Sequence, residues 1–223
     1  MGPMIMRQSL TIAILTYNRA KMLQRAVRSA LAQYSPFVDI EVLVIDDGSR
    51  DNSQQRLAKY IDKMRYIRLE ENVGVGRASA LAVKEAKSEF FVRLDSDDFL
   101  SSHFALHMAP ILAENPSIDF VSCDIQMLDE IENPLSRVSR EKWEDLCDFG
   151  AGVIFRKSAV ESAGGYDPKL RTREDLDLFL RLSKQGASRF HLPLALYRRR
   201  IHEKNISKDS SFISEKERLL GER

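Results

Sequence analysis

Residues 90–98 read FFVRLDSDD, a short apolar run that ends in three carboxylates within four residues. The apolar part predicts a buried strand because it is short, rich in Phe and Val, and bounded by polar residues. The carboxylates would then lie at the carboxyl end of that strand, where open α/β sheets bind their ligands. Closely spaced like charges repel unless protons or a cation neutralise them, and such oxygen ligands suit Mg²⁺ or Mn²⁺. Taken alone, the run is also typical of a solvated acidic turn that caps the next helix.

Three β–α units precede this strand. Apolar runs at 9–15, 40–45 and 66–69 are each followed by apolar residues at helical spacing. The order β-α-β-α-β-α-β predicts a parallel sheet with helices on both faces, and right-handed crossovers place the carboxyl ends of the strands on one edge. We therefore expect the polar runs that end three of these strands to meet in one site. These runs are Thr16-Tyr17-Asn18-Arg19, Asp46-Asp47 and Asp95-Ser96-Asp97.

The second half of the chain is less regular. Residues 126–149 are polar and charged without a clean period, which is typical of a substrate-facing lid or of a plain surface excursion. Around this segment the sequence predicts three strands and two helices. The strands are expected at 118–123, 153–155 and 194–199, and the helices at 101–112 and 173–182.

Composition bounds the class of protein. The chain has 223 residues, 43% of them hydrophobic, and a formal net charge of +1, so it can bury the core of one sizeable domain. A near-neutral charge gives no support for a nucleic-acid binder, whose domains are usually strongly basic. Two cysteines make neither a disulfide framework nor a zinc set. We expect a cytoplasmic protein without a transmembrane segment, with peripheral contact on the inner membrane face left open.

Each further motif has a structural interpretation beside a functional one. The run at 46–49, DDGS, is a common turn after a strand, but an acidic side chain there could accept a hydrogen bond from a base or a ribose. Glu174-Asp175 opens a predicted helix, where acidic residues suit the helix dipole, but a carboxylate there could also act as a general base. His202 is a surface residue or a metal ligand. Arg198 to Arg200 indicate a solvated strand edge or contact with a diphosphate.

Residues 74–79, GVGRAS, raise a different possibility, since they follow a strand and open a helix as a dinucleotide fingerprint does. The third glycine of that fingerprint is missing, because Ser79 stands in its place. The motif also lies in the third β–α unit rather than in the first. A nicotinamide-dependent oxidoreductase is therefore the weakest of the alternatives.

In their order, six motifs resemble those of family-2 glycosyltransferases with the GT-A fold, over roughly residues 9–207. The sequence departs from the family pattern in three places. No proline precedes the first motif, Ala80 lies where a second asparagine is common, and His202 is displaced by one residue after the arginines. The matching motifs are 14–19 (ILTYNR), 44–49 (VIDDGS), 71–77 (ENVGVGR), 94–98 (LDSDD), 164–178 with its GGYD and EDLDL runs, and 197–207 (YRRRIHEKNIS).

The resemblance implies a binding site for a nucleotide sugar. Thr16 and Tyr17 would line the nucleobase pocket, Asp46 would accept a hydrogen bond from the base, and Arg77 would lie near the base or the phosphates. The other residues expected in this site are Asn18, Arg19, Asp47, Asn72, Gly74, Asp95 and Ser96.

The resemblance also implies a metal site and a catalytic base. Asp97 would bind Mn²⁺ or Mg²⁺, Asp95 would face both the ribose and the metal, and His202 would lie near the metal or the diphosphate. Asp175 would be the catalytic base. Glu174 beside it would touch the acceptor or the donor sugar.

The resulting expectation is an inverting hexosyltransferase. The donor would be a nucleotide diphosphate sugar, with UDP as the expected nucleotide, and the acceptor a glycan, a lipid-linked molecule or a protein, chosen with help from residues 126–149. A sugar nucleotidyltransferase and a non-catalytic nucleotide-sugar-binding or scaffold protein are the alternatives. No Q-x-x-R-W element of processive synthases is present.

The expected fold is a single α/β domain of GT-A type. Its central sheet would be mostly parallel and Rossmann-like, with helices on both faces and a smaller mixed region on the acceptor side. The expected parts are an N-terminal tail (1–8), a nucleotide-sugar-binding half (9–100), an acceptor-binding and catalytic half (101–202), and a charged C-terminal tail (203–223).

Overall fold

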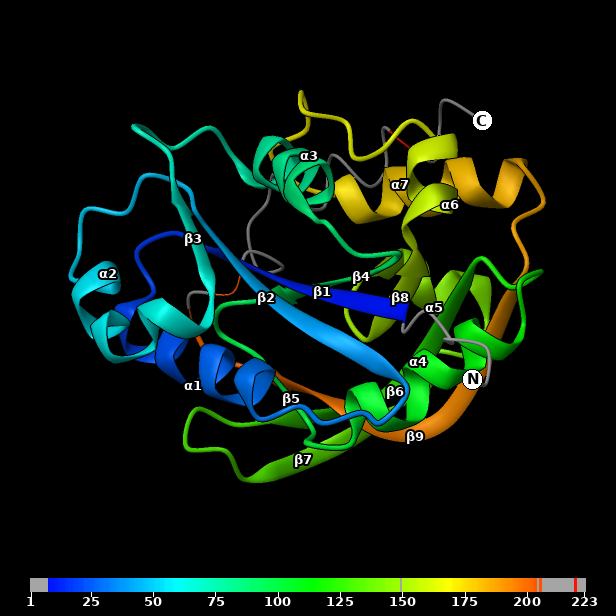
Figure 1. The fold of residues 1–223 in the computed structure, drawn as a ribbon, viewed down its shortest axis with the longest axis horizontal. Helices are drawn as coiled ribbons and strands as arrows, with labels where there is room; N and C mark the ends of the chain where they lie inside the picture. The colour runs from blue at the N-terminus through cyan, green and yellow to red at the C-terminus, as the bar shows by residue number, and fades with distance from the viewer. Residues whose placement is uncertain (1–7, 149, 204, 206–218, 220–223) are drawn as a thin grey trace, which may run out of the picture.

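The computed structural model describes residues 8–148, 150–203, 205 and 219, and within them nine strands form one sheet (Figure 1). The sheet has the order β3-β2-β1-β4-β8-β6-β9-β5, and β7 pairs with β6 off this path. The strands are β1 (Gln8–Thr16), β2 (Val38–Asp46), β3 (Arg65–Arg68), β4 (Phe90–Asp95), β5 (Phe99–Leu100), β6 (Phe120–Leu128), β7 (Pro134–Val138), β8 (Val153–Arg156) and β9 (Arg189–Arg200).

Helices cover both faces of this sheet, as the sequence predicts. They are α1 (Ala20–Leu31), α2 (Ser53–Arg56), the 3₁₀ helix η1 (Ala58–Lys63), α3 (Val75–Glu85), α4 (Phe104–Glu114), α5 (Trp143–Asp148), α6 (Lys157–Ser162) and α7 (Glu174–Lys184). The second predicted helix is therefore one short α-helix followed by a 3₁₀ turn. None of the described helices is long and apolar enough to cross a membrane.

The first half of the sheet is parallel. Strands β3, β2, β1 and β4 all run in one direction, with Thr16 beside Asp46 and Leu15 beside Asp95. The register brings the carboxyl ends of β1, β2 and β4 to the same edge of the sheet. This part of the α/β prediction is confirmed.

The second half of the sheet is mixed. Strand β8 runs antiparallel between β4 and β6, while β9 is parallel to β6 and antiparallel to β5. The sequence predicts only the second half of β9, because Pro193 interrupts the strand pattern. In the structure the pairing of β9 with β6 shifts between Leu192 and Ala195, so the proline lies in an irregular stretch of the ladder. A proline cannot donate a ladder hydrogen bond and is tolerated at such places.

Two hydrophobic cores lie on the two faces of the sheet. In β1, Ile12 and Ile14 point to a core shared with α1 and α4, while Ala13 and Leu15 point to a core shared with α3, α6 and α7. In Figure 1, α3, α6 and α7 lie on one side of β1 and α1 and α4 on the other. Burial on both faces explains why β1 and β4 are mostly apolar, without regular polar alternation.

Residues 126–149, which lack a clean period in the sequence, contain regular structure. They hold the end of β6, the exposed strand β7 and helix α5, whose Trp143 ring packs edge-on against Phe120 with centroids 5.5 Å apart. Helix α5 lies against α7, next to the start of the catalytic motif predicted at residues 174–175. Most of the two predicted tails, 1–8 and 203–223, falls outside the described residues, although Gln8 belongs to β1.

Candidate functional site

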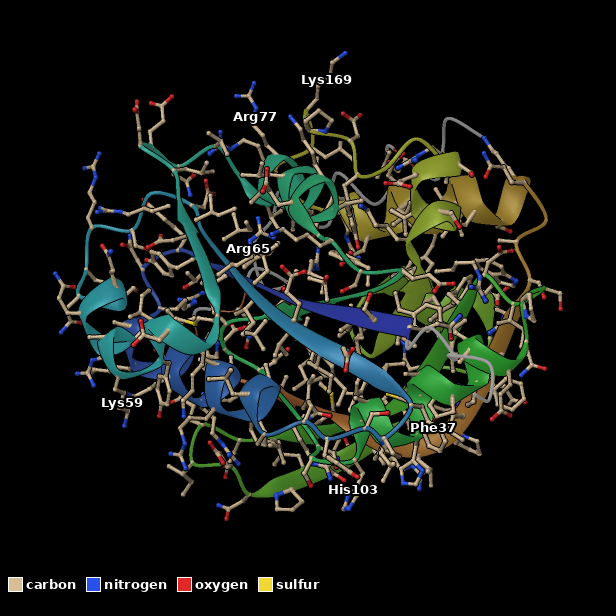
Figure 2. All side chains as sticks on the ribbon, viewed as in Figure 1. Phe37, Lys59, Arg65, Arg77, His103 and Lys169 are labelled. Carbon is tan, nitrogen blue, oxygen red and sulfur yellow. The ribbon has the colours of Figure 1, made fainter. Side chains whose placement is uncertain are left out.

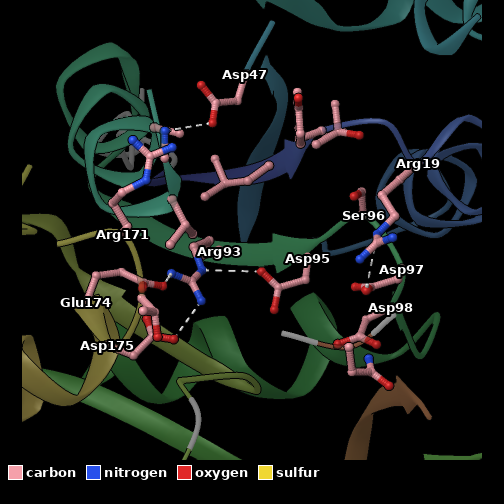
Figure 3. A pocket seen from close by; sticks show the side chains of 18 of the residues that line it. Arg19, Asp47, Arg93, Asp95, Ser96, Asp97, Asp98, Arg171, Glu174 and Asp175 are labelled. Carbon is pink, nitrogen blue, oxygen red and sulfur yellow. Dashed lines mark hydrogen bonds and ion pairs between the residues drawn. The ribbon is translucent and has the colours of Figure 1, made fainter. Parts of the chain in front are cut away.

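A pocket of about 560 Å³ opens at the edge where β1, β2 and β4 end (Figure 3). The sheet ladder continues one residue beyond the strands there. The Asp47 N–H donates to the Thr16 carbonyl at 2.9 Å, and the Ser96 N–H donates to the Leu15 carbonyl at 3.2 Å. These bonds hold the three polar runs side by side, as their positions at strand ends predict. The residues expected in the nucleotide-sugar site that line the pocket are Thr16, Tyr17, Asn18, Arg19, Asp47, Asn72, Gly74, Asp95 and Ser96.

One wall of the pocket is organised by Asp47. Its carboxylate accepts hydrogen bonds from the Asn72 side chain at 2.8 Å and from the backbone N–H groups of Val73 at 2.7 Å and Gly74 at 3.0 Å. Gly74 has φ +92°, a conformation that favours glycine, and α3 begins at the next residue. Asp47 thus fixes the loop that leads into α3. Tyr17, with 42% of its surface exposed, offers a ring at the mouth of the pocket.

Two residues expected in this site lie elsewhere. Asp46 is only 1% exposed, and its carboxylate already accepts hydrogen bonds from the Ser49 N–H and the Tyr66 hydroxyl. It therefore braces the end of β2 and does not line the pocket. Arg77 is exposed on the outer side of α3 and points away from the molecule in Figure 2. The predicted roles of both residues stay predictions, and neither side chain lines the pocket. A motif fixes neither which face of a helix an arginine takes nor which local donors satisfy a carboxylate.

The acidic run after β4 divides into two parts. Asp95 and Asp97 line the pocket, and the Asp95 side chain is 41% exposed. Asp98 also borders the pocket but is 3% exposed, and it accepts hydrogen bonds from the Tyr197 hydroxyl at 2.9 Å and the Arg200 N–H at 2.8 Å. Burial, together with the charges of Asp97 and Asp95, raises the pKa of Asp98 well above its usual range. Asp98 thus ties the acidic turn to β9.

Asp97 and Asp95 have opposite electrostatic surroundings. Burial opposes the charge of Asp97, but the hydrogen bond from His202 and the nearby charge of Arg19 lower its pKa. The His202 Nε2 lies 3.0 Å from Asp97 Oδ2, and Arg19 Nε lies 3.8 Å from the same oxygen. The pKa of Asp95 is raised, mainly because the pocket wall displaces water from it and Asp97 lies nearby, although Arg93 acts in the opposite direction. The structure therefore pairs His202 with Asp97, while Asp95 and Asp97 both line the pocket.

The donor set at this place suits a divalent cation. The carboxylates of Asp95 and Asp97 line the pocket, and the His202 imidazole contacts Asp97. Carboxylate oxygen is the ligand type that Mg²⁺ and Mn²⁺ prefer. Within the described part of the chain, no three or more Asp, Glu, His or Cys side chains are placed so that together they could hold a metal ion. Mg²⁺ usually takes one or two carboxylates and completes its shell with substrate phosphates and water. The residues fit a cation of that kind.

At the other end of the pocket a buried guanidinium joins the remaining acids (Figure 3). Arg93, in β4, pairs with Glu174 and with Asp175, the second at 2.6 Å, and its Nε lies 3.6 Å from Asp95. Its Nη1 also donates to the Ser79 hydroxyl at 3.2 Å. The side chain of Arg93 is only 8% exposed, so these ion pairs are shielded from water. One arginine therefore holds three carboxylates from two distant parts of the chain.

Asp175 is a carboxylate in the pocket lining that pairs with Arg93. It lies in the first turn of α7, and its Oδ2 accepts a hydrogen bond from the Gly150 N–H at 3.1 Å. Burial raises the pKa of Asp175 to about 7, and the charges of Glu174 and Asp95 add to that rise while Arg93 opposes it. A Cβ at Gly150 would overlap the Asp175 carboxylate, so only glycine permits this approach.

Several lining residues had no role in the sequence interpretation. Arg93 carries the one available signal, since a charged residue inside a buried apolar strand requires a partner. The loop before α7 gives no such signal. Arg199 lines the pocket whereas Arg200 is buried, so these consecutive arginines of β9 lie in different surroundings. The lining residues missed are Arg93, Arg171, Thr172, Arg173 and Asn205.

Comparison with known proteins agrees with this geometry. Residues 11–205 match the model of the family described as glycosyl transferase family 2. The chain belongs to this family. An uncharacterised glycosyltransferase of Rickettsia typhi is 28% identical over 86% of this chain and 64% of its own length. The chain thus spans less than two thirds of the curated relatives that it matches first.

Solved structures show the same GT-A fold for this family-2 chain. The crystal structure of S. aureus TarS 1–349 in complex with UDP-GlcNAc has a TM-score of 0.78 and 22% identity, covering 95% of this chain and 65% of TarS 1–349. A mannosyltransferase from Pyrobaculum calidifontis, in complex with GDP-Man and Mn²⁺, has a TM-score of 0.69 and 18% identity, covering 89% of this chain and 59% of its own. The predicted family and fold class are both confirmed.

Proposed function

We propose that this family-2 chain transfers a sugar from a nucleotide diphosphate sugar to an acceptor hydroxyl with inversion at the anomeric carbon. The observation that carries the proposal is the position of Asp175. This carboxylate, with a pKa of about 7, lies in the same pocket as the acidic turn of Asp95 and Asp97. A base and a diphosphate site are thus both within reach of one bound donor.

The donor would lie along the strand ends. Its base would stack near Tyr17 between the loops that follow β1 and β2, where Asp47 and Asn72 offer polar groups. Its ribose would approach Asp95. UDP is the nucleotide we expect, since TarS, the neighbour with the higher TM-score of the two described, is in complex with UDP-GlcNAc.

The diphosphate would lie beside the acidic turn. Asp97, Asp95 and His202 would hold Mn²⁺ or Mg²⁺. The cation would act as a Lewis acid and neutralise charge on the departing diphosphate. Arg19 and Arg199 also line the pocket and place positive charge in advance of the reaction. Charge placed in this way needs no rearrangement as negative charge develops on the leaving group.

The chemical step uses a single displacement. Asp175 takes the proton of the acceptor hydroxyl while the acceptor oxygen forms a bond to the anomeric carbon from the face opposite the diphosphate. The bond from that carbon to the phosphate oxygen breaks, and its electron pair leaves with the nucleoside diphosphate. Because one bond forms where another breaks on the opposite face, the anomer inverts. Glu174, held on the other side of Arg93, would contact the donor sugar or the acceptor.

The test compares the protein with Asp175→Asn and with Asp62→Asn, a matched change at an exposed carboxylate of η1. Each protein is given UDP, GDP and dTDP sugars with Mn²⁺ and with water as the acceptor. We expect release of a nucleoside diphosphate and of a sugar whose first-formed anomer is inverted, as seen by NMR. Asp175→Asn should lower kcat by about 10²–10⁴-fold, the usual contribution of acid–base catalysis, and Asp62→Asn should have no effect.

Two results would contradict the proposal. Pyrophosphate formed from a nucleoside triphosphate and a sugar 1-phosphate, with no nucleoside diphosphate released from the nucleotide sugars, would identify a sugar nucleotidyltransferase. Nucleotide-sugar binding with no turnover for any donor or for a panel of glycan acceptors would support a non-catalytic binding protein. Full turnover by Asp175→Asn would be consistent with a transferase but would show that Asp175 is not its general base.

A further inference from the structure

A second cavity, of about 340 Å³, lies outside the candidate donor site. It is a groove bordered by α1, β5 and β9. Strand β5 contacts α1 and pairs with β9 (Figure 1). Three arginines and the turn before α4 line it: Arg25 and Arg28 of α1, Arg198 of β9, and Ser101 and Ser102. None of its lining residues lines the donor pocket.

The elements aim these side chains at one place. Arg25 and Arg28 are three residues apart on α1, so they lie on one face of the helix. Arg198 is the antiparallel partner of Phe99, and the two side chains share one face of the sheet. The guanidinium of Arg25 stacks on the Phe99 ring, 4.0 Å from its centroid. The ring thus supports Arg25 beside Arg198.

The groove has an excess of positive charge. Glu132, on the turn between β6 and β7, forms salt bridges with both Arg25 at 3.2 Å and Arg200 at 2.7 Å. Within the described part of the chain, neither Arg28 nor Arg198 forms a salt bridge with a carboxylate. Burial without an acidic neighbour lowers the pKa of Arg198. A bound anion would stabilise a partly buried guanidinium that has no carboxylate partner.

The turn before α4 adds to this potential. Ser101 and Ser102 lie just before the N-terminus of an eleven-residue helix, whose dipole favours negative charge. Hydroxyl groups and guanidinium forks together match the oxygen atoms of a phosphate.

We propose that the groove between α1, β5 and β9 is a binding site for a phosphate-type oxyanion, held by Arg28 and Arg198 with help from Arg25 and the Ser101–Ser102 turn. No residue lines both this groove and the donor pocket, and Arg198 of the groove is the sequence neighbour of Arg199 in the pocket. Arg19, which lines the donor pocket, is nine residues before Arg28, or about 14 Å along the helix at 1.5 Å per residue. The ligand is therefore a second phosphate group, on a lipid head group or on a soluble molecule such as a phosphorylated acceptor.

The test measures the dissociation constant of inorganic pyrophosphate by calorimetry, in EDTA so that no divalent cation supports binding in the donor pocket. The double variant R28Q/R198Q should bind at least about tenfold more weakly. The control R56Q/K84Q removes two exposed positive charges on α2 and α3 and should bind as the unmodified protein does. Equal affinity in R28Q/R198Q and the unmodified protein would overturn the proposal.

Sedimentation with vesicles separates the two sources of phosphate. Binding to phosphatidylglycerol vesicles but not to phosphatidylcholine vesicles, lost in R28Q/R198Q, would identify a lipid head group. Pyrophosphate binding without vesicle binding would identify a soluble phosphate ligand. Metal-dependent donor hydrolysis should be unchanged in R28Q/R198Q, so failure of this proposal and failure of the transferase proposal are distinguishable.

Discussion

Arg93 connects the two ends of the candidate site. It contacts Asp95, next to the expected metal, and Glu174 and Asp175 at the start of α7. Its own pKa is raised well above the usual value, since the three carboxylates outweigh the cost of burial. A single guanidinium cannot neutralise two adjacent carboxylates, so the Glu174–Asp175 pair retains negative charge, which contributes to the raised pKa of Asp175.

This pKa predicts a pH dependence of turnover. A general base acts only when deprotonated, so kcat/KM should fall about tenfold per pH unit below about 7 and level off above it. The charged groups that face Asp175 are Arg93 and Asp95 from β4 and Glu174 from α7. A pH series of donor turnover at saturating Mn²⁺ checks this. A profile that stays flat down to pH 5 would show that Asp175 does not titrate in the step.

Loss of the guanidinium should shift that profile. Because Arg93 lowers the pKa of Asp175 against the other influences, Arg93→Met should raise this pKa and move the acid limb to higher pH. Arg93→Lys keeps one charge but lacks the planar fork, so it should give a smaller shift. The measurement is the same pH series. A reduced kcat with an acid limb at the same pH as in the unmodified protein would contradict the prediction. Arg93→Met should also destabilise the fold by about 3–5 kcal/mol, as expected when one partner of a buried ion pair is removed.

Single residues mark the limit of prediction from the sequence. Asp95, Asp97 and Asp175 follow from their places at a strand end and a helix start, and the structure brings them into one pocket. The surroundings of Arg77 and Asp46 do not follow from the sequence. Arg77 lies on an exposed face of α3, and the Asp46 carboxylate accepts a hydrogen bond from the Tyr66 hydroxyl. The partners of Arg93 are about eighty residues away, which no local pattern reveals.

At the scale of elements, the parallel strands are predictable and the mixed ones are not. Strands β1, β2 and β4 are predominantly apolar and end in polar residues, so their positions and their common edge follow from the sequence. The partners of β6 and β9 depend on pairings across some seventy residues. Strand β7 is exposed over most of its length and has no apolar alternation to reveal it.

Helix α3 depends on one glycine. The Gly76 N–H donates to the Leu170 carbonyl at 3.2 Å, and a Cβ there would lie too close to the carbonyls of Leu170 and Asp167. Gly76→Ala should therefore lower the free energy of unfolding by about 1–3 kcal/mol, as overpacking does. It should also weaken donor binding, since the same loop runs on to Arg171 and Arg173 of the pocket. Urea unfolding checks the first effect, with the exposed Lys84→Ala of the same helix as the control. A more stable Gly76→Ala, as helix propensity alone predicts, would contradict the close approach.

At the scale of the whole molecule, the pocket lies where the two expected halves of the chain meet. The half at 9–100 supplies the strand ends and the acidic turn, and the half at 101–202 supplies Asp175 and the arginines around it. Both halves contribute strands to one sheet. The division into two functional halves stays a prediction, and Arg93 is the residue that spans it.

The central claim is that this pocket holds a nucleoside diphosphate together with a divalent cation. Its most direct test is thermal unfolding with UDP, GDP, dTDP, ATP and NAD, each with and without Mn²⁺, for the protein and for Asp97→Ala. A ligand at 100 times its Kd stabilises by about 2.7 kcal/mol, which raises Tm by roughly 5–11 °C in a chain of this size. We predict such a rise for UDP only with Mn²⁺, and its loss in Asp97→Ala. A rise with NAD alone, or no Mn²⁺-dependent rise with any nucleoside diphosphate, would contradict the account.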